Sequence, residues 1–255
     1  MARVLGYGGL GNTNGLRDFS GKAEAEEEDD MPDASDLPWK KIKTRFDAAR
    51  EFLKLSLRTL TPDKSFCVIF FGSQAELMKT TPGLMPATKA NIDKCIRELD
   101  RIKGGPGSKD RPDGLLRGNT NLHGGMHRAF KVRNRGLSKN REYVDPDTFI
   151  QGADTIFLLS DGKPTWDDWP IVDKRDPYDN TGDPESNVRH PDQPNLKFPG
   201  PYGYFYTPWL VDDIRRLNLF RKCEIHCVGI GEADSGLISE IARIGMGMTR
   251  FVGGS

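Results

Sequence analysis

The sequence predicts an α/β fold with a doubly wound, mostly parallel sheet, helices on both faces and one short antiparallel edge strand. Strand and helix patterns alternate along most of the chain, which is typical of this architecture. The run Thr155-Ile-Phe-Leu-Leu159 is apolar or β-branched throughout rather than alternating, as expected for a strand that helices cover on both sides. At 255 residues, the chain is long enough for one domain with a sizeable core and insertions.

Residues 1–38 differ from the rest of the chain, because they are rich in glycine at the start and acidic toward the end. This composition predicts a disordered segment, with the domain itself over residues 39–255. The stretch Gly6-Tyr-Gly-Gly-Leu-Gly11 matches the dinucleotide pattern G-x-G-x-x-G, but more glycines follow where the motif needs a helix. Asp33-Ala-Ser35 offers a carboxylate and a hydroxyl, for which we expect a turn or helix-capping role.

Two helices and two strands are expected in the first part of the domain. Residues 39–60 form a helix because apolar side chains recur at steps of three and four. A second helix is expected over 88–102, capped by Thr88. Between them, 66–71 has the pattern of a buried strand, and 74–79 that of a short edge strand that runs antiparallel.

The next helix is expected after Gly125, and two histidines lie near its start. His123 and His127 are four residues apart, a spacing that can place two imidazoles on one metal ion. Zinc hydrolases of this pattern have glutamate directly after the first histidine, whereas this chain has Gly124. We therefore expect a polar pair near a helix start, with a zinc-dependent enzyme as the alternative. Residues 134–150 have the composition of a polar loop.

A long insertion covers about residues 166–208 and combines turn-forming residues with many aromatic side chains. Loops of this length are usually functional or disordered, and the aromatic content argues against plain disorder. We expect Trp166, Trp169, Tyr202 and Tyr204 to lie in a loop on the ligand-binding face. The alternative is that these rings only pack the loop onto the domain.

After the insertion, the pattern predicts a helix over 210–217, a strand over 224–230, a helix over 237–244 and a last strand over 249–252. Together with 66–71 and 154–160, these strands form the predicted sheet. The side chains expected to be buried are Phe46, Leu53, Val68, Phe70, Phe157, Leu159 and Val228.

Composition excludes several classes of partner. The 37 basic side chains balance the 37 acidic ones, so no global field favours nucleic acid or a membrane surface. The sequence has no apolar run of membrane-spanning length and no signal-peptide core, so we expect a soluble protein, cytoplasmic by default. The four cysteines fall inside predicted strands or helices without metal-cluster spacing, so we expect buried free thiols.

Several motifs resemble the von Willebrand factor A-type (VWA) domain. Thr120-Asn-Leu-His-Gly-Gly and Phe157-Leu-Leu-Ser-Asp161-Gly-Lys-Pro-Thr resemble the second and third metal-site motifs of that family. Similarity continues through Ile225-His-Cys-Val-Gly-Ile-Gly231 and Met248-Thr-Arg-Phe-Val-Gly, in the family's order, and covers roughly residues 39–254. The family's first motif, Asp-x-Ser-x-Ser at the tip of its central first strand, is missing.

The resemblance implies a Rossmann-like sheet that binds a Mg²⁺-type ion at its edge, with an acidic side chain of a partner protein completing the coordination. Only Thr120 and Asp161 carry over as ligands. Two ligands are too few to preorganise an octahedral site, so we expect an incomplete site with weak Mg²⁺ or Mn²⁺ binding and no other cofactor. Without a metal, Thr120 would cap a helix and Asp161 would begin an Asp-Gly turn.

The resemblance therefore implies a protein-binding module that is not an enzyme, with a degenerate metal-ion-dependent adhesion site. Two alternatives remain: an enzyme that uses nucleotide at Gly6–Gly11 or zinc at His123 and His127, and a truncated, inactive domain fragment. The truncated-domain alternative depends on whether another segment takes the place of the missing first strand. Only residues 2–7 can replace it, which would bring Gly6, Gly8 or Gly9 near the metal motifs, and we expect such a domain to be marginally stable.

Overall fold

The computed structural model describes residues 4–9, 34–72, 75–102, 120–140, 143–160, 164, 188–189, 197–198, 207–231 and 233–252. The helices are α1 (Arg45–Thr59), α2 (Lys89–Arg101), α3 (Leu122–Lys131), α4 (Pro146–Gln151), α6 (Thr207–Arg221) and α7 (Ser235–Ile244), preceded by the 3-10 turns η1 (Ala34–Asp36) and η2 (Trp39–Lys41). The main sheet contains β1 (Val4–Gly9), β2 (Lys64–Phe71), β3 (Ala75–Leu77), β4 (Met85–Pro86), β7 (Thr155–Ser160), β10 (Glu224–Ile230) and β11 (Thr249–Val252). Two small hairpins join β5 (Val132–Arg133) to β6 (Gly136–Leu137) and β8 (Val188–Arg189) to β9 (Lys197–Phe198).

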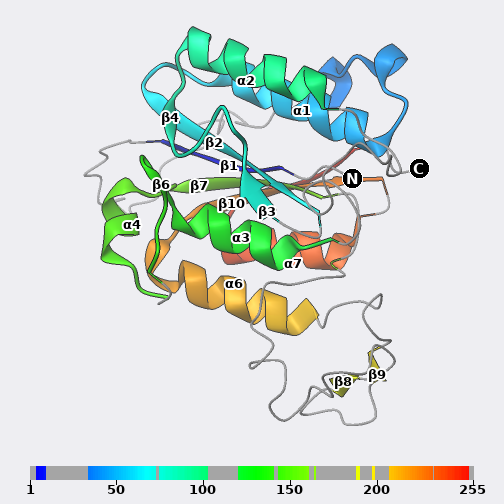
Figure 1. The fold of residues 1–255 in the computed structure, drawn as a ribbon. Coiled ribbons are helices and arrows are strands. Elements are labelled where there is room, and N and C mark those ends of the chain that lie inside the picture. The colour runs from blue at the N-terminus through cyan, green and yellow to red at the C-terminus, as the bar shows by residue number, and fades with distance from the viewer. Residues whose placement is uncertain are drawn as a thin grey trace, which may run out of the picture.

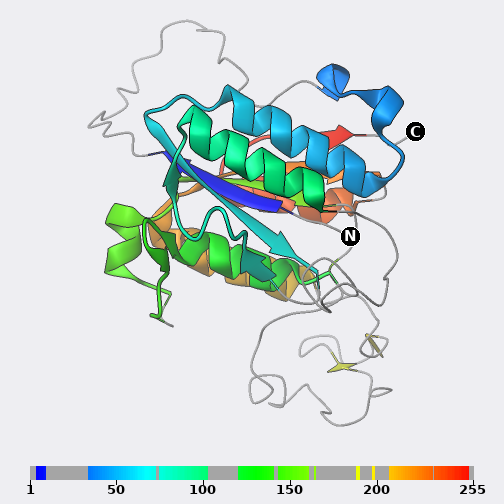
Figure 2. The same cartoon turned by 45° about the horizontal axis from the view of Figure 1, so that its top comes forward.

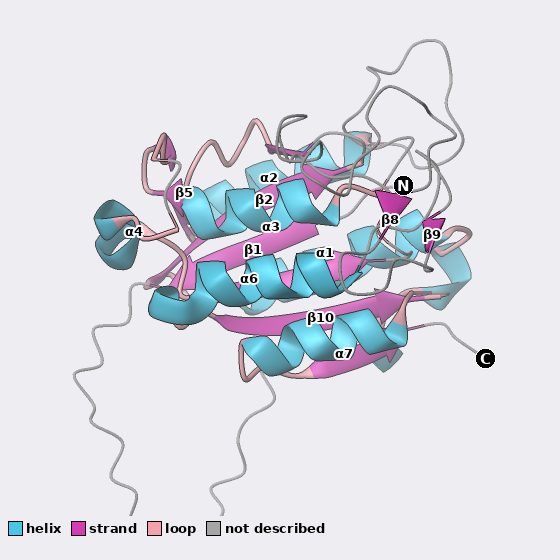
Figure 3. Cartoon of the chain, turned by 90° about the horizontal axis from the view of Figure 1, so that it is seen from below, coloured by secondary structure: helices cyan, strands magenta, loops and turns pink. Residues whose placement is uncertain are grey.

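These elements form three layers. The sheet lies between α1 and α2 on one face and α3, α6 and α7 on the other (Figure 1). On the second face α6 lies between α3 and α7 and contacts both (Figure 3). The α/β class is therefore as predicted. Among the described residues, no helix has the length and apolar character needed to cross a membrane.

The sheet is less parallel than the sequence predicts. Its strand order is β11-β10-β7-β1-β2-β3, with β4 also paired to β2. β10 is parallel to β7 and to β11, whereas β1 is antiparallel to both of its neighbours, and β3 and β4 are antiparallel to β2. Four strands, β2, β7, β10 and β11, thus point one way. The antiparallel edge strand predicted over 74–79 is present as β3.

β1 occupies the central position for which the sequence has no ordinary strand (Figure 2). Val4 is opposite Phe70 on one side and Leu159 on the other, and Gly9 is opposite Lys64. Part of the segment expected to be disordered therefore belongs to the sheet, because β2 and β7 both need backbone partners there. Residues 1–3 and 10–33 lie outside the described residues.

The direction of β1 corrects one expectation. Because β1 runs antiparallel, its first residue lies beside the carboxyl ends of β2 and β7, while Gly8 and Gly9 lie beside Ser65 and Lys64 at the start of β2. Gly8 and Gly9 are therefore at the opposite end of the sheet from the strand tips that carry the metal motifs.

Two apolar clusters, one on each face of the sheet, form the core. One cluster packs α1 and α2 against alternate side chains of β2, β7 and β10, and the other packs α3, α6 and α7 against the remaining ones. Successive residues of β2 therefore contribute to opposite clusters, as Phe70 and Phe71 do. The seven side chains expected in the core are all buried, the most exposed being Leu53 at 7%.

Local capping sets the helix boundaries, and it shifts several of them from the predicted positions. α1 begins at Arg45 rather than near residue 39, because Thr44 and Asp47 form a reciprocal capping box. Thr88 caps α2 as predicted, accepting a hydrogen bond from the Asn91 amide at 3.3 Å. The polar loop predicted over 134–150 instead contains β6 and α4, the latter capped by the Asp145 side chain.

All four cysteines are free and buried, as predicted. Burial raises the pKa of Cys67 and of Cys95 to about 12, and that of Cys223 to about 11. The thiols therefore remain protonated at neutral pH and behave as apolar core groups.

We predict that Leu5→Pro lowers the free energy of unfolding by roughly 2–3 kcal/mol, because Leu5 pairs with both Ile69 and Leu158 and proline removes its amide from the ladder. Chemical denaturation would measure the change, with Leu5→Ile as the control that keeps the amide. Equal stability of the two variants would show that β1 is not part of the sheet.

Candidate functional site

The first candidate site is the sheet edge at which β2, β7 and β10 end. Thr120 is 6% exposed and lies at this edge, because the next amide, that of Asn121, donates to the Gly72 carbonyl at 2.7 Å. β7 ends nearby at Ser160, two strand positions away with β1 between. This separation corresponds to about 10 Å across the sheet. Thr120 and the end of β7, which are far apart in the sequence, thus lie at the same edge of the sheet.

The described residues do not by themselves make a Mg²⁺ site here. Thr120 contributes one neutral oxygen, and β1 has the sequence Val-Leu-Gly-Tyr-Gly-Gly, without the carboxylate or hydroxyl of the missing motif. Mg²⁺ requires six well-placed oxygens, so water would have to supply most of them. Asp161 lies outside the described residues, and its role as a ligand remains a prediction.

The structure corrects some of the other residues that the sequence suggested and does not describe the rest. Gly6, Gly8 and Gly9 lie within β1 rather than in a turn between a strand and a helix, so the dinucleotide interpretation is wrong for them. Thr120 is not a helix cap, because Asn121 caps α3 instead. Trp166, Trp169, Tyr202 and Tyr204 lie outside the described residues, as does Asp33. Ser35 is exposed in η1.

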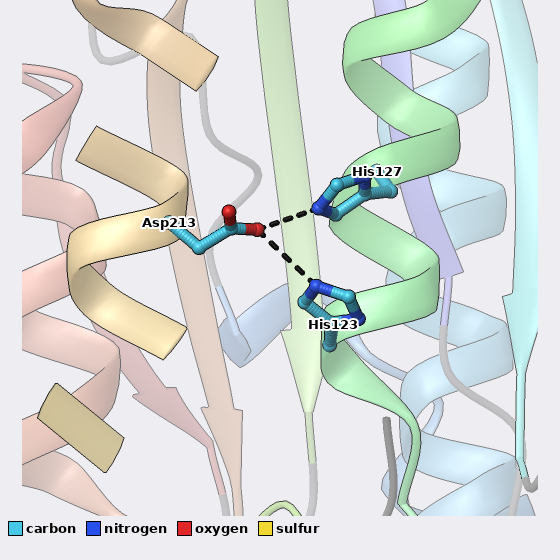
Figure 4. A group of neighbouring side chains, drawn as sticks. All are labelled: His123, His127 and Asp213. Atoms are coloured by element: carbon cyan, nitrogen blue, oxygen red, sulfur yellow. Dashed lines mark hydrogen bonds and ion pairs between the residues drawn. The ribbon is translucent and has the colours of Figure 1, made fainter. Parts of the chain in front are cut away.

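The second candidate site is a cluster of His123, His127 and Asp213 between α3 and α6 (Figure 4). The Nε2 atoms of His123 and His127 lie 3.2 Å and 2.5 Å from the same Asp213 oxygen, Oδ2. The two imidazole rings have centroids 4.3 Å apart. The His123 and Asp213 side chains are each 4% exposed, and that of His127 is 26% exposed. The cluster is thus a largely buried polar contact inside a helix layer.

Tyr143 completes the surroundings of the carboxylate. Its hydroxyl donates to Oδ1 of Asp213 at 2.6 Å, so both carboxylate oxygens have partners. Burial would raise the pKa of Asp213, but hydrogen bonds from His123, His127 and Tyr143 outweigh it and hold that pKa below its usual range. Burial lowers the pKa of His127, opposed in part by Asp213, and burial also raises the pKa of Tyr143. At neutral pH the cluster therefore contains an ionised Asp213 carboxylate in contact with a neutral His127 and a neutral Tyr143.

Helix geometry explains how these side chains meet. Asn121 accepts a hydrogen bond from the Gly124 amide at 2.7 Å, so α3 begins at Leu122 and contains both histidines on one face. The two histidines do lie near a helix start, as expected, and α6 packs against the face that carries them. Asp213, which is 86 residues from His127, was not predicted as a member of this cluster. The sequence did contain a sign that Asp213 is buried, because it lies three residues after Leu210 and four before Leu217, on the apolar face of its helix.

We predict that Asp213→Ala, measured in the presence of a chelator, lowers the free energy of unfolding by about 3 kcal/mol, because His123, His127 and Tyr143 all lose the buried carboxylate that they contact. Asp212→Asn is the matched control, because this neighbouring carboxylate is 53% exposed and its partner Arg215 is also at the surface. Its effect should remain within about 0.5 kcal/mol. Similar effects of the two substitutions would contradict a stabilising contact between Asp213 and the two histidines.

Comparison with known proteins gives one informative similarity. No known protein-family profile matches the chain. A stretch of 116 residues, 46% of this chain, is 29% identical to inter-alpha-trypsin inhibitor heavy chain H1 of Mesocricetus auratus. The matched stretch corresponds to 10% of that longer protein.

Proposed function

We propose that this chain is a non-enzymatic protein-binding module of the VWA type, with a doubly wound, Rossmann-like arrangement and a degenerate metal site. The observation that carries the proposal is the position of Thr120 at the sheet edge where β2 and β7 both end. In α/β sheets, ligands bind outside the carboxyl ends of the strands. Helices on both faces leave this edge as the natural recognition surface.

The similarity to an inter-alpha-trypsin inhibitor heavy chain agrees with an interaction role, since that name describes a chain of an inhibitor. The aromatic insertion supports the same proposal. Trp166, Trp169, Tyr202 and Tyr204 belong to the segment that follows β7, and large aromatic side chains are enriched in protein interfaces.

A basic side chain at this edge supports recognition of an acidic partner without a strongly bound ion. A methyl group placed on Gly231, directly after β10, would lie 3.0 Å from Nε of Arg45, so the Arg45 side chain lies against the end of that strand. Guanidinium groups bind carboxylates in two-point geometry. In the proposed module Arg45 pairs with the partner's acidic side chain, and Mg²⁺ or Mn²⁺ at Thr120 and Asp161 contributes weakly.

The test is selection of peptides from a displayed library on the immobilised chain, with Mg²⁺ and again with EDTA. We predict that acidic peptides are selected in both buffers and that Arg45→Glu weakens their binding about tenfold, because a rim charge is reversed. Arg58→Glu is the matched control, because Arg58 is exposed in the last turn of the same helix, far from the edge.

Selection of peptides without acidic residues, or equal losses in the two arginine variants, would contradict recognition at this edge. Binding that EDTA and Asp161→Ala both abolish would instead show a working metal site. That result would mean that groups outside the described residues supply the missing ligands.

A further inference from the structure

The cluster of His123, His127 and Asp213 has the chemistry of a metal site and takes no part in the proposed binding edge. Each side chain offers one ligand atom, and the three atoms lie within 4.8 Å of one another. Two of these atoms are imidazole nitrogens from successive turns of α3, and the third is a carboxylate oxygen from α6. Histidines at positions i and i+4 of a helix are a familiar way to hold two ligands of one ion.

The observed distances are close to those that a tetrahedral ion requires. Metal–ligand bonds of 2.0–2.2 Å place neighbouring ligand atoms about 3.3 Å apart. His123 Nε2 is already 3.2 Å from Asp213 Oδ2, and the 2.5 Å contact of His127 needs to open by less than about 1 Å. The two imidazole nitrogens lie within 4.8 Å of each other, so an ion that binds all three groups would draw them to about 3.3 Å by side-chain rotation.

The Asp213 carboxylate is already oriented by a hydrogen bond from a neighbouring side chain, as metal-binding carboxylates usually are. The Tyr143 hydroxyl occupies Oδ1 of Asp213, which leaves Oδ2 directed at the two imidazoles. Hydrogen bonds of this kind orient metal ligands and commonly affect metal affinity by ten- to a hundredfold. Tyr143 therefore acts as a positioning residue for the carboxylate.

The donor set selects the kind of ion. Two imidazole nitrogens and one carboxylate oxygen suit Zn²⁺ and related transition metals, whereas Mg²⁺ and Ca²⁺ prefer sites made of oxygen alone. The cluster therefore prefers a different ion from the sheet edge at Thr120, where a hydroxyl oxygen is a ligand of the Mg²⁺ type.

We propose that His123, His127 and Asp213 bind one Zn²⁺ ion that ties α3 to α6, with water in the fourth position. The ion would join two helices of one layer, so the role we assign to it is structural. Its position matters for the domain because α3 begins two residues after Thr120, and α6 begins where the 166–208 insertion ends. The ion would fix the helix after the insertion to the helix at the recognition edge.

The direct test is titration of the full chain, stripped of metal with a chelator and then dialysed, first with Zn²⁺ by calorimetry and then with Co²⁺ by visible absorption. We expect one ion per chain, d–d bands of tetrahedral Co²⁺, and a melting temperature raised by about 5–10 °C at a hundredfold excess of Zn²⁺ over its dissociation constant. His127→Gln and Asp213→Asn should each weaken binding at least tenfold, and Tyr143→Phe should weaken it less.

Asp212→Asn is the control for loss of a neighbouring carboxylate and should bind Zn²⁺ like the parent chain. His127→Gln keeps the test valid if Asp213→Asn fails to fold, since His127 is the most exposed of the three ligands. Absence of one-to-one binding, binding that His127→Gln leaves unchanged, or thiolate charge-transfer bands in the Co²⁺ spectrum would overturn the proposal. Failure here leaves peptide binding at the Arg45 edge unaffected, so the two proposals can be tested separately.

Discussion

The fold depends on backbone hydrogen bonding in the centre of the sheet. β2 and β7 point the same way and are covered on both faces, so their facing edges cannot be satisfied by water. β1 lies between them and pairs with both, and this insertion makes one continuous sheet out of two halves. The packing of helices on both faces relies on that continuity, because each apolar cluster includes side chains from β2, β7 and β10.

The direction of β1 also determines what the recognition edge can contain. Because β1 is antiparallel, its amino-terminal residue lies beside the carboxyl ends of β2 and β7. The chain therefore leaves β1 at the opposite end of the sheet. A VWA-type metal motif requires a strand that ends at the recognition edge. In the proposed module, an incomplete metal site would follow from strand direction as well as from the missing residues. Thr120 and Arg45 are two described polar groups at this edge.

The second face of the sheet carries its own polar contact. α6 lies between α3 and α7, and its Asp213 reaches across to both histidines of α3. A buried carboxylate among apolar neighbours is costly unless donors surround it. His123, His127 and Tyr143 supply those donors, so the cluster fixes the register of α6 on α3 with or without a bound ion.

Periodicity in the sequence predicted most of the regular structure and little of the site. The runs that form β2, β7 and β10 are mostly apolar, and the apolar side chains of α1 recur at helical steps, so local patterns were sufficient. β1 was harder to predict, because its three glycines carry no burial pattern and its place depends on a gap between distant strands. Asp213 was missed for a similar reason: its partners lie 86 and 90 residues earlier in the chain (213 − 127 and 213 − 123), and only tertiary packing brings them together. Thr120 could be proposed from the sequence because its motif is local, and its role as a ligand remains a prediction.

The most direct test of this account is the direction of β1, measured by NMR from backbone contacts between strands. The account predicts nuclear Overhauser effects from Val4 to Phe70 and to Leu159, and from Gly9 to Lys64. Effects that connect Gly9 with Phe70 or Leu159 would show a parallel strand and restore a strand tip to the recognition edge. Effects from Phe70 directly to Leu159, without contacts to residues 4–9, would show that the central strand is absent.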